Sequence, residues 1–293
     1  MPAEKPAPAE KPAPAEKPAN KLAQALTRVR GKSPLVHCIT NYVTANDCAN
    51  VLLACGASPI MADDPGEAEE ITSLAAGLVL NLGTLDQRKF SAMLLSGKRA
   101  NALGIPVVLD PVGAGASSLR TESALRLLQE VRFSVIRGNM SEIRTLALGA
   151  GHTYGVDAGA ADRVTEQSLP EAVDFVKSFS AKTGAIAAVS GGIDLVADGG
   201  RALVIRGGHP MMGRITGAGC MLSALTGAFA AANRDDFLTA AAAAVCAMDL
   251  CGEKAAARVT PPDGSGSFRT YLLDAVYNLT PEELERGANY ELR

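Results

Sequence analysis

The sequence contains no tryptophan, and aromatic residues make up only 4% of its 293 residues. A protein that binds single-stranded nucleic acid needs aromatic side chains on which bases stack, so this composition disfavours that function. The chain also has no excess of positive charge, because its formal net charge is −3 and its isoelectric point is near 5.7. Neither nucleic acid nor an anionic membrane surface is therefore expected as a partner.

The cysteines form no Cys-x-x-Cys pair and show no spacing typical of a metal site. They are Cys38, Cys48, Cys55, Cys220, Cys246 and Cys251. A chain of this length can build a core without disulfides, so we expect free thiols and a cytoplasmic location. Long apolar runs are missing as well. The alanine-rich stretches are interrupted by the polar residues 233–236, too soon for a membrane-spanning helix.

Residues 1–19 read MPAEKPAPAEKPAPAEKPA, a tandem repeat without the apolar segment of a signal peptide. Its prolines oppose a stable helix, and it has no apolar face to bury. We therefore expect a disordered, solvated tail that takes no part in the fold. No linker interrupts the remainder, which predicts a single domain over residues 20–293.

From residue 20 onward, short β-rich segments alternate with helical stretches. Strands are predicted at 35–39, 58–61, 78–82, 106–110, 133–137, 185–189, 195–197 and 202–206, and helices at 45–55, 67–74, 87–103, 118–131, 171–183, 221–232, 237–256, 268–279 and 281–286. Strands that are apolar almost throughout are typical of a parallel sheet buried on both faces. The pattern predicts an α/β fold whose mostly parallel central sheet has helices on both faces. The close spacing of the strands within 185–206 predicts a local antiparallel meander.

One glycine-rich segment precedes the predicted helix that starts at Met221. It consists of Thr216, Gly217, Ala218, Gly219 and Cys220. A glycine-rich turn at a helix N-terminus exposes backbone N–H groups, and the helix dipole adds partial positive charge there. Such a segment forms an anion site suited to a phosphate. The structural alternative is a tight loop in which Cys220 is a small core residue.

Polar residues also follow the predicted strands, at the sheet edge where α/β proteins bind ligands. Asp110 and Glu142 offer the hard oxygen ligands that suit Mg²⁺, and the guanidinium of Arg137 suits a phosphate. With the anion segment, these groups make a set suited to phosphoryl transfer. Each alone has a structural alternative: Asp110 as a turn cap, Glu142 as a solvated residue in the first turn of a helix, Arg137 as a surface ion-pair partner.

A dinucleotide-binding fingerprint is nearly matched by residues 113–118, which follow a strand and open a helix. Ser118 replaces the third small residue of that fingerprint, and Pro111 lies between the strand and the turn. The next strand ends in Arg137 instead of an acid that could bind a ribose. An oxidoreductase is therefore disfavoured.

Seven motifs carry a family resemblance. They are CITNYVTAND (38–47), GASPIMA (56–62), NLGTL (81–85), LDPVGAGAS (109–117), IRGNMSEI (136–143), GVDAG (155–159) and ITGAGC (215–220). With these motifs in this order, the chain resembles the hydroxyethylthiazole kinases of the ribokinase-like superfamily over essentially all of residues 20–293. The resemblance implies a ribokinase-like three-layer sandwich. It also implies transfer of the γ-phosphoryl group of ATP to the primary alcohol of 4-methyl-5-(2-hydroxyethyl)thiazole, for thiamine biosynthesis or salvage.

The same resemblance implies homotrimers with substrate pockets at subunit interfaces, and roles for individual residues. Asn41, Met61 and Gly217 would contact the thiazole. Arg137 and Ser190 would contact ATP, although family members often have threonine at the position of Ser190.

The resemblance also assigns the metal and the catalytic position. Asp110 and Glu142 would organise Mg²⁺, and Asn139 would support them. Cys220 takes the place where related sugar kinases carry an aspartate base. Because a thiol is a weak base at neutral pH unless the helix end lowers its pKa, we expect Cys220 to contribute modestly and mainly to shape the loop.

Two alternatives stay open from the sequence. A related kinase for hydroxymethylpyrimidine or a sugar would keep the anion segment and the carboxylates, but is expected to have aspartate at position 220. A vitamin-binding protein without enzymatic activity would be expected to have lost part of the phosphate-binding set, which is complete here.

Overall fold

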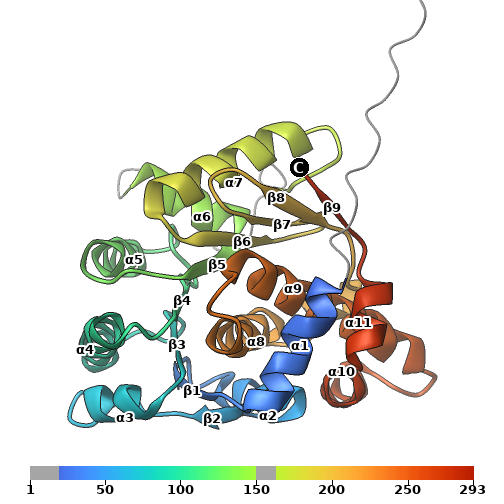
Figure 1. The fold of residues 1–293 in the computed structure, drawn as a ribbon, viewed down its shortest axis with the longest axis horizontal. Coiled ribbons are helices and arrows are strands. Elements are labelled where there is room, and N and C mark those ends of the chain that lie inside the picture. Colours follow the sequence, from blue (N-terminus) through green and yellow to red (C-terminus); the bar gives the residue numbers. More distant parts are fainter. Residues whose placement is uncertain (1–19, 150–162) are drawn as a thin grey trace, which may run out of the picture.

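The computed structural model describes residues 20–149 and 163–293, so the predicted tail (1–19) and the GVDAG motif (155–159) lie outside the described residues. The strands within these ranges are β1 (Leu35–Ile39), β2 (Ser58–Ile60), β3 (Gly77–Asn81), β4 (Val107–Asp110), β5 (Val135–Asn139), β6 (Ile186–Ser190), β7 (Asp194–Ala197), β8 (Ala202–Ile205) and β9 (Tyr290–Leu292). They form one sheet in the order β2-β1-β3-β4-β5-β6-β7-β8-β9 (Figure 1). All pairs from β2 to β6 are parallel, and β6 to β9 pair antiparallel. The predicted mostly parallel sheet and the local meander are confirmed.

Helices cover both faces of this sheet, as predicted (Figure 1). The α-helices of the described residues are α1 (Lys21–Lys32), α2 (Ala45–Cys55), α3 (Ala68–Leu74), α4 (Gln87–Leu103), α5 (Ser118–Glu130), α6 (Met140–Leu148), α7 (Leu169–Thr183), α8 (Ala218–Ala232), α9 (Phe237–Arg258), α10 (Ser265–Asn278) and α11 (Pro281–Gly287), and a short 3₁₀ helix, η2, spans Pro210–Arg214. Helices α3 to α7 pack on one face, and α1, α2 and α8 to α11 pack on the other.

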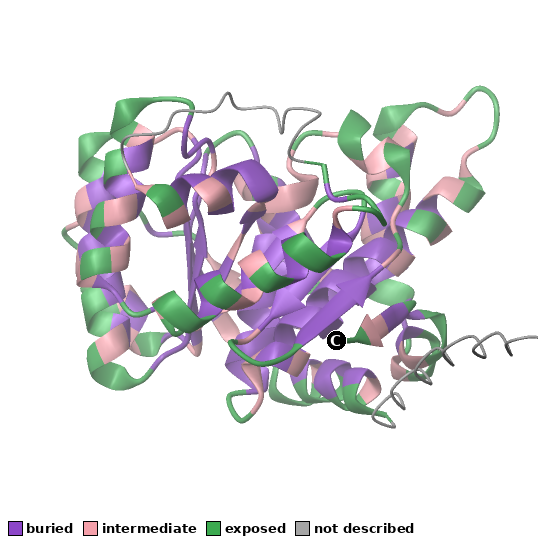
Figure 2. Ribbon diagram, turned by 90° about the horizontal axis from the view of Figure 1, so that it is seen from above, coloured by how far each residue is buried: buried purple, intermediate pink, exposed green. Residues whose placement is uncertain are grey.

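The sheet separates two hydrophobic cores, and alternate residues of each strand enter opposite ones. In β3, Leu78 and Leu80 belong to the core under α3 to α7, whereas Val79 belongs to the core under α8 and α9. In β4, Leu109 and Val108 divide in the same way. Side chains of a strand point alternately to its two faces, so a sheet covered on both sides needs apolar residues at every position. Figure 2 shows the inner strands of the sheet as buried, whereas the edge strands β2 and β9 are partly exposed.

The structure differs from the predicted elements at a few places. Helix α8 begins at Ala218, three residues before the predicted start at Met221, because Gly217 adopts a left-handed conformation that starts the helix at once. Strand β5 continues through Asn139, since backbone pairing with β6 extends past the polar Arg137. The sequence analysis did not predict α1 or β9, and it gave no bounds for α6, the helix of Glu142. Helix α1 is held by apolar side chains on one face, and the three-residue β9 forms only through pairing with β8.

Candidate functional site

The carboxyl ends of the parallel strands bring the predicted site residues to one edge of the sheet. Asn81 ends β3 and is paired with Asp110 at the end of β4, and Asn139 ends β5 and is paired with Ser190 at the end of β6. Asn41 lies two residues beyond β1. Strand β1 has β2 on one side and β3 on the other, so the strand order reverses there. Ligands of open α/β sheets bind at such a switch point.

The N-terminus of α8 has the geometry of an anion site. Gly217 is its N-cap at φ 87°, and no side chain of the described residues caps this end. The first hydrogen bond inside the helix runs from the N–H of Met221 to the carbonyl of Gly217, at 2.8 Å. The N–H groups of the preceding first turn therefore have no partner within the helix. The sequence analysis placed Ala218, Gly219 and Cys220 before a helix that starts at Met221. In the structure these three residues belong to the first turn of α8.

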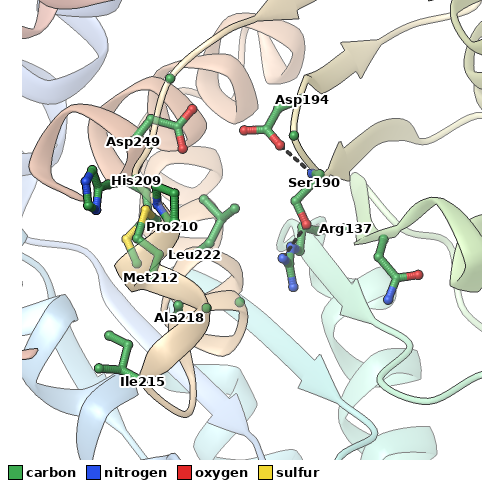
Figure 3. Close-up of a pocket in the computed structure, with 18 of the residues that line it drawn as sticks. Arg137, Ser190, Asp194, His209, Pro210, Met212, Ile215, Ala218, Leu222 and Asp249 are labelled. Carbon is green, nitrogen blue, oxygen red and sulfur yellow. Dashed lines mark hydrogen bonds between the residues drawn. The ribbon is translucent and has the colours of Figure 1, made fainter. Parts of the chain in front are cut away.

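A cavity of about 1010 Å³ opens beside this helix end. Residues 217–219 line one part of it, together with Arg137, Asn139 and Ser190. Arg137 Nη2 donates a hydrogen bond to Ser190 Oγ at 2.6 Å (Figure 3). This part of the cavity thus presents a guanidinium, a hydroxyl and helix N–H groups, all suited to phosphate oxygens.

Asp194 and Asp249 lie at another part of the same cavity. Figure 3 shows their carboxyl groups pointing toward one another. Burial and the charge of Asp194 raise the pKa of Asp249 to about 9, and burial raises the pKa of Asp194. Two neighbouring buried carboxyl groups cannot both be charged at low cost, so the pair holds a proton at neutral pH. This part of the cavity is poorly suited to phosphates.

Asp110 is fully buried, and its two oxygens differ in their surroundings. Its Oδ2 accepts hydrogen bonds from Asn81 Nδ2 and Ser223 Oγ, both at 2.7 Å, and Arg137 Nη1 lies 3.7 Å from it. Its Oδ1 and Arg137 Nε are both buried without a hydrogen-bond partner among the described residues. Buried polar atoms without partners are rare in proteins, and two of opposite character at one place indicate a ligand site.

Glu142 is buried and ordered by backbone amides. Its Oε1 accepts from the N–H of Gly113 at 2.9 Å, and its Oε2 accepts from the N–H of Asn139 at 2.8 Å. Asn139 Oδ1 accepts in return from the N–H of Glu142, which completes a capping box at the start of α6. Burial and the charge of Asp110 raise the pKa of Glu142. The interpretation of Glu142 as a solvated first-turn residue is therefore wrong.

The donor set at this edge fits a magnesium ion held mainly by its substrate. The ranges 20–149 and 163–293 contain no group of three or more His, Cys, Asp or Glu side chains that could hold a metal on their own. Asp110 Oδ1 is nevertheless free to accept, and each oxygen of Glu142 keeps a lone pair beyond its amide bond. Mg²⁺ usually keeps waters and uses one or two carboxylates plus phosphates, which this arrangement matches.

Cys220 lies among amide donors. Its Sγ accepts hydrogen bonds from Asn41 Nδ2 at 3.2 Å and from Asn81 Nδ2 at 3.3 Å. Burial and the charge of Asp110 raise the pKa of this thiol, although hydrogen bonds from Thr44 and the two asparagines act in the opposite direction. Cys220 is therefore a neutral thiol near pH 7, which makes it a weak base.

Of the residues predicted to contact the thiazole, Gly217 lines the large cavity, whereas Asn41 and Met61 do not. Asn41 is 5% exposed, and its Oδ1 accepts from both the N–H and the hydroxyl of Thr44 at 3.0 Å. Met61 follows β2 and is 37% exposed, so it is not a core residue. Tyr42 and Val43 are 78% and 55% exposed at the same edge. The loops after β1 and β2 thus present apolar side chains to the outside.

Comparison with known proteins decides the family. The model of the family described as "HK: Hydroxyethylthiazole kinase family" matches residues 26–282. The chain belongs to the hydroxyethylthiazole kinase family. A hydroxyethylthiazole kinase of Clostridium acetobutylicum is 56% identical over 270 residues, which cover 92% of this chain and 99% of that protein. A second, from Methanocella arvoryzae, is 48% identical over 91% of this chain and 96% of its own length.

Solved structures agree with this membership of the hydroxyethylthiazole kinase family. The hydroxyethylthiazole kinase protein of Pyrococcus horikoshii matches with a TM-score of 0.80 and 38% identity, over 93% of this chain and 98% of that one. Pyridoxal kinase of Staphylococcus aureus matches with a TM-score of 0.56 at 15% identity, over 88% and 97%, which shows a shared fold. The ribokinase-like fold predicted for this family member is confirmed. The cysteines are all free, and no helix of the described residues is long and apolar enough to span a membrane.

Sequence reasoning assigned no role to four polar residues of this edge. They are Asn81, Asp194, Ser223 and Asp249. Asn81 had a usable signal, since it is the one polar residue of the predicted strand 78–82 and stands in a motif of this kinase family. Ser223 and Asp249 lie in the interior of helices α8 and α9, where a polar residue carries no information about which strand or cavity it faces.

Proposed function

We propose that this chain transfers the γ-phosphoryl group of ATP to the primary hydroxyl of 4-methyl-5-(2-hydroxyethyl)thiazole. The product is the thiazole phosphate used in thiamine biosynthesis or salvage. The observation that carries this conclusion is the match to named hydroxyethylthiazole kinases, at up to 56% identity over 92% of the chain. We further propose a cytoplasmic location, which the free thiols of all six cysteines support.

We assign the phosphates of ATP to the part of the cavity beside α8. The first turn of α8 would hold phosphate oxygens through residues 216–219 and the N–H groups that follow Gly217. Arg137 and Ser190 would bind the nucleotide from the adjacent parallel strands β5 and β6. The hydrogen bond between them and the unpartnered Arg137 Nε support this assignment. The charge of the guanidinium and the dipole of the helix both favour an anion at this place.

We assign Mg²⁺ to Asp110 and Glu142, with Asn139 in support. When bound there, the ion would neutralise charge on the phosphate oxygens of the nucleotide. The support is the free Oδ1 of Asp110 and the amide-held carboxylate of Glu142. Asn139 contributes by capping α6 and keeping Glu142 in place.

We assign the thiazole to Asn41, Met61 and Gly217, with its alcohol next to Cys220. Asn41 already donates a hydrogen bond to the Cys220 thiol, so a ligand held there would lie beside the N-terminus of α8. We propose a homotrimer in which a second subunit completes this pocket. The exposed Tyr42, Val43 and Met61 support it, because apolar side chains gathered at one edge favour an interface.

The chain's own groups would act mainly by positioning. Phosphoryl transfer through a loose transition state needs little removal of the proton from the alcohol, so a neutral Cys220 thiol suffices. Arg137 and the α8 amides would hold the phosphoryl group near the alcohol and stabilise its charge. Cys220 would shape the first turn of α8 and contribute little as a base.

An assay with a panel of alcohols tests the proposed function. ATP consumption is measured with the thiazole alcohol, with the hydroxymethylpyrimidine and with neither, in Mg²⁺ and again after its removal with a chelator. We expect turnover only with the thiazole alcohol and Mg²⁺. Turnover of the pyrimidine alone would assign the chain to another ribokinase-like activity, and ligand-induced thermal stabilisation without turnover would indicate a binding protein. Light scattering after size-exclusion chromatography tests the trimer.

A further inference from the structure

Asn81 lies between the residues assigned to the thiazole and those assigned to Mg²⁺. It ends β3, with Asp110 beside it at the end of β4, and β1 with the following Asn41 lies on its other side. Its side chain is 1% exposed, so it contacts protein on all sides. This position places one amide between the residue assigned to the thiazole and a residue assigned to Mg²⁺.

The amide of Asn81 uses every hydrogen bond that it can make. Its Nδ2 donates to Asp110 Oδ2 at 2.7 Å and to Cys220 Sγ at 3.3 Å. Its Oδ1 accepts from Asn41 Nδ2 at 3.1 Å and from the N–H of Gly83 at 2.9 Å. A half-turn of the amide would set its NH₂ group against two other donors, so this network permits one orientation.

Ser223, on helix α8, also donates a hydrogen bond to Asp110 Oδ2. It lies three residues after Cys220 on α8, it is 0% exposed, and its Oγ is 2.7 Å from Asp110 Oδ2. The Gly219 carbonyl is a second possible acceptor at 3.2 Å, but a hydroxyl has one proton and the carboxylate is the stronger and nearer acceptor. Donors from β3 and α8 therefore converge on one oxygen of Asp110.

These two donors fix the rotation of the Asp110 carboxylate. The terminal torsion of an aspartate is soft, and nothing else among the described residues hydrogen-bonds either oxygen of Asp110. With Oδ2 held twice, Oδ1 is the oxygen left without a partner. The difference between the two oxygens of Asp110 is therefore set by its hydrogen-bond partners and not by Asp110 alone.

We propose that Asn81 and Ser223 are positioning residues, which hold Asp110 by Oδ2 so that Oδ1 stays available to the nucleotide and its Mg²⁺. Asn81 additionally aligns Asp110 with Cys220 and Asn41. One amide is then shared by the residue assigned to the nucleotide and its Mg²⁺ and the residues assigned to the thiazole alcohol. This inference rests on the proposed function, because it takes Asp110 as the residue that meets the metal.

Ser223→Ala tests the proposal with the loss of one oxygen atom. Ser96→Ala is the matched control: Ser96 is equally buried, in α4, and its hydroxyl donates to the Ala68 carbonyl. We expect Ser223→Ala to lower kcat by about 10- to 100-fold relative to Ser96→Ala, the effect typical of groups that orient a metal ligand. KM for the thiazole alcohol should stay unchanged. Titration of Mn²⁺ by electron paramagnetic resonance, with a nonhydrolysable ATP analogue, should show weaker binding by a similar factor.

Asn81→Ala tests whether Asn81 also aligns Asp110 with Cys220 and Asn41. It should lower kcat and Mn²⁺ affinity as Ser223→Ala does, and in addition raise KM for the thiazole alcohol, because Asn41 and Cys220 lose their shared partner. If Asn81→Ala does not fold, the comparison of Ser223→Ala with Ser96→Ala decides the positioning role.

Equal kcat and Mn²⁺ affinity in Ser223→Ala and Ser96→Ala would overturn the proposal. Asp110→Asn serves as the reference for complete loss of the metal-facing oxygen, and a variant of Asp110 that binds Mn²⁺ normally would overturn it as well. If the wild-type protein does not phosphorylate the thiazole alcohol, the proposed function fails, and the Mn²⁺ titrations still decide whether Asn81 and Ser223 orient Asp110.

Discussion

The α-carbon of Gly219 lies against the guanidinium of Arg137, so closely that a Cβ at position 219 would be 2.7 Å from Arg137 Nη1 and 3.0 Å from Nη2. The first turn of α8 and strand β5 therefore approach each other through a residue that has no side chain. This contact sets where the Arg137 guanidinium can lie relative to the helix N-terminus. It makes position 219 sensitive to a single methyl group.

Gly219→Ala is expected to raise KM for ATP by about 10- to 100-fold, because the displaced guanidinium no longer meets the phosphates at the right distance. KM for the thiazole alcohol should change little. Gly266→Ala, at a helical position with nothing within 4 Å of the added atom, is the control and should behave as wild type. An unchanged KM for ATP in Gly219→Ala would show that Arg137 does not bind the nucleotide from this position.

Arg137→Ala removes the guanidinium itself. We expect KM for ATP to rise by about 10- to 100-fold, the value of a charge-assisted hydrogen bond to phosphate, and KM for the thiazole alcohol to rise far less. Arg126→Ala, which breaks an exposed ion pair with Glu130, controls for the loss of a positive charge. A larger effect on the thiazole alcohol than on ATP would reverse the assignment of Arg137.

Gly217→Val should abolish turnover. Gly217 has φ 87°, where a β-branched residue is strained, and its Cβ would lie 2.7 Å from Thr44 Cγ2. Gly184→Val shares the strain at φ 72° but has open space around the added atoms and lies at the end of α7, away from the site. Kinetics and thermal unfolding of both variants separate the two effects. Comparable losses of activity would mean that backbone strain alone, and not crowding beside α2, explains the defect.

Cys220→Asp is expected to keep or increase turnover. Asn41 and Asn81 already direct donors at the sulfur, and a carboxylate in its place would accept from both. A positioned base is worth about 100-fold or more where proton removal limits the rate, and the gain here should be smaller because phosphoryl transfer needs little base catalysis. Cys220→Ser should also stay active. An inactive but folded aspartate variant, measured by steady-state kinetics and circular dichroism, would reveal a role that requires the thiol.

Asp249→Asn should stabilise the protein more as pH rises. Burial, Asp194 and Glu253 raise the pKa of Asp249 to about 9, while Arg137 opposes the shift at Asp194. The folded state therefore keeps a proton that the unfolded chain releases above its ordinary pKa. The stability that this proton gives is complete at acid pH and is lost as pH rises toward 9, by at most about 1.4 kcal/mol per pH unit.

The measurement for Asp249→Asn is the difference in melting temperature from wild type between pH 5 and pH 9. The asparagine still hydrogen-bonds to Asp194 but does not titrate, so the difference should widen with pH. Asp274→Asn, which removes a carboxylate from an exposed ion pair with Arg258, is the control. Parallel curves for wild type and Asp249→Asn would show that the pair does not hold a proton.

Three elements with a clear local sequence pattern were predicted to the residue. Strand Leu35–Ile39 and helices Ala45–Cys55 and Gln87–Leu103 match their predicted bounds, because their apolar pattern ends in turn residues. Strand β9 could not be found in this way. Three residues form a strand there only since the exposed edge of β8 supplies their hydrogen-bond partners, and no local pattern records that pairing.

The candidate site likewise has features that local sequence predicts and features that only tertiary packing creates. The strand ends placed Asp110 and Ser190 at the same edge of the sheet, since parallel strands end together. The convergence of Asn81 and Ser223 on one oxygen of Asp110 depends on how α8 is seated on the sheet. The facing carboxyl groups of Asp194 and Asp249 likewise arise from packing between β7 and α9.

Strand β9 also has a practical consequence. It hydrogen-bonds along β8, and the backbone of Arg293 bonds to that of Ala202 in both directions at 2.7 Å. Removing residues 290–293 would uncover a nearly fully apolar strand, ALVI, with unpaired backbone groups along one side. Such a strand recruits other chains, so a shortened protein should precipitate on concentration even where its catalytic residues are intact.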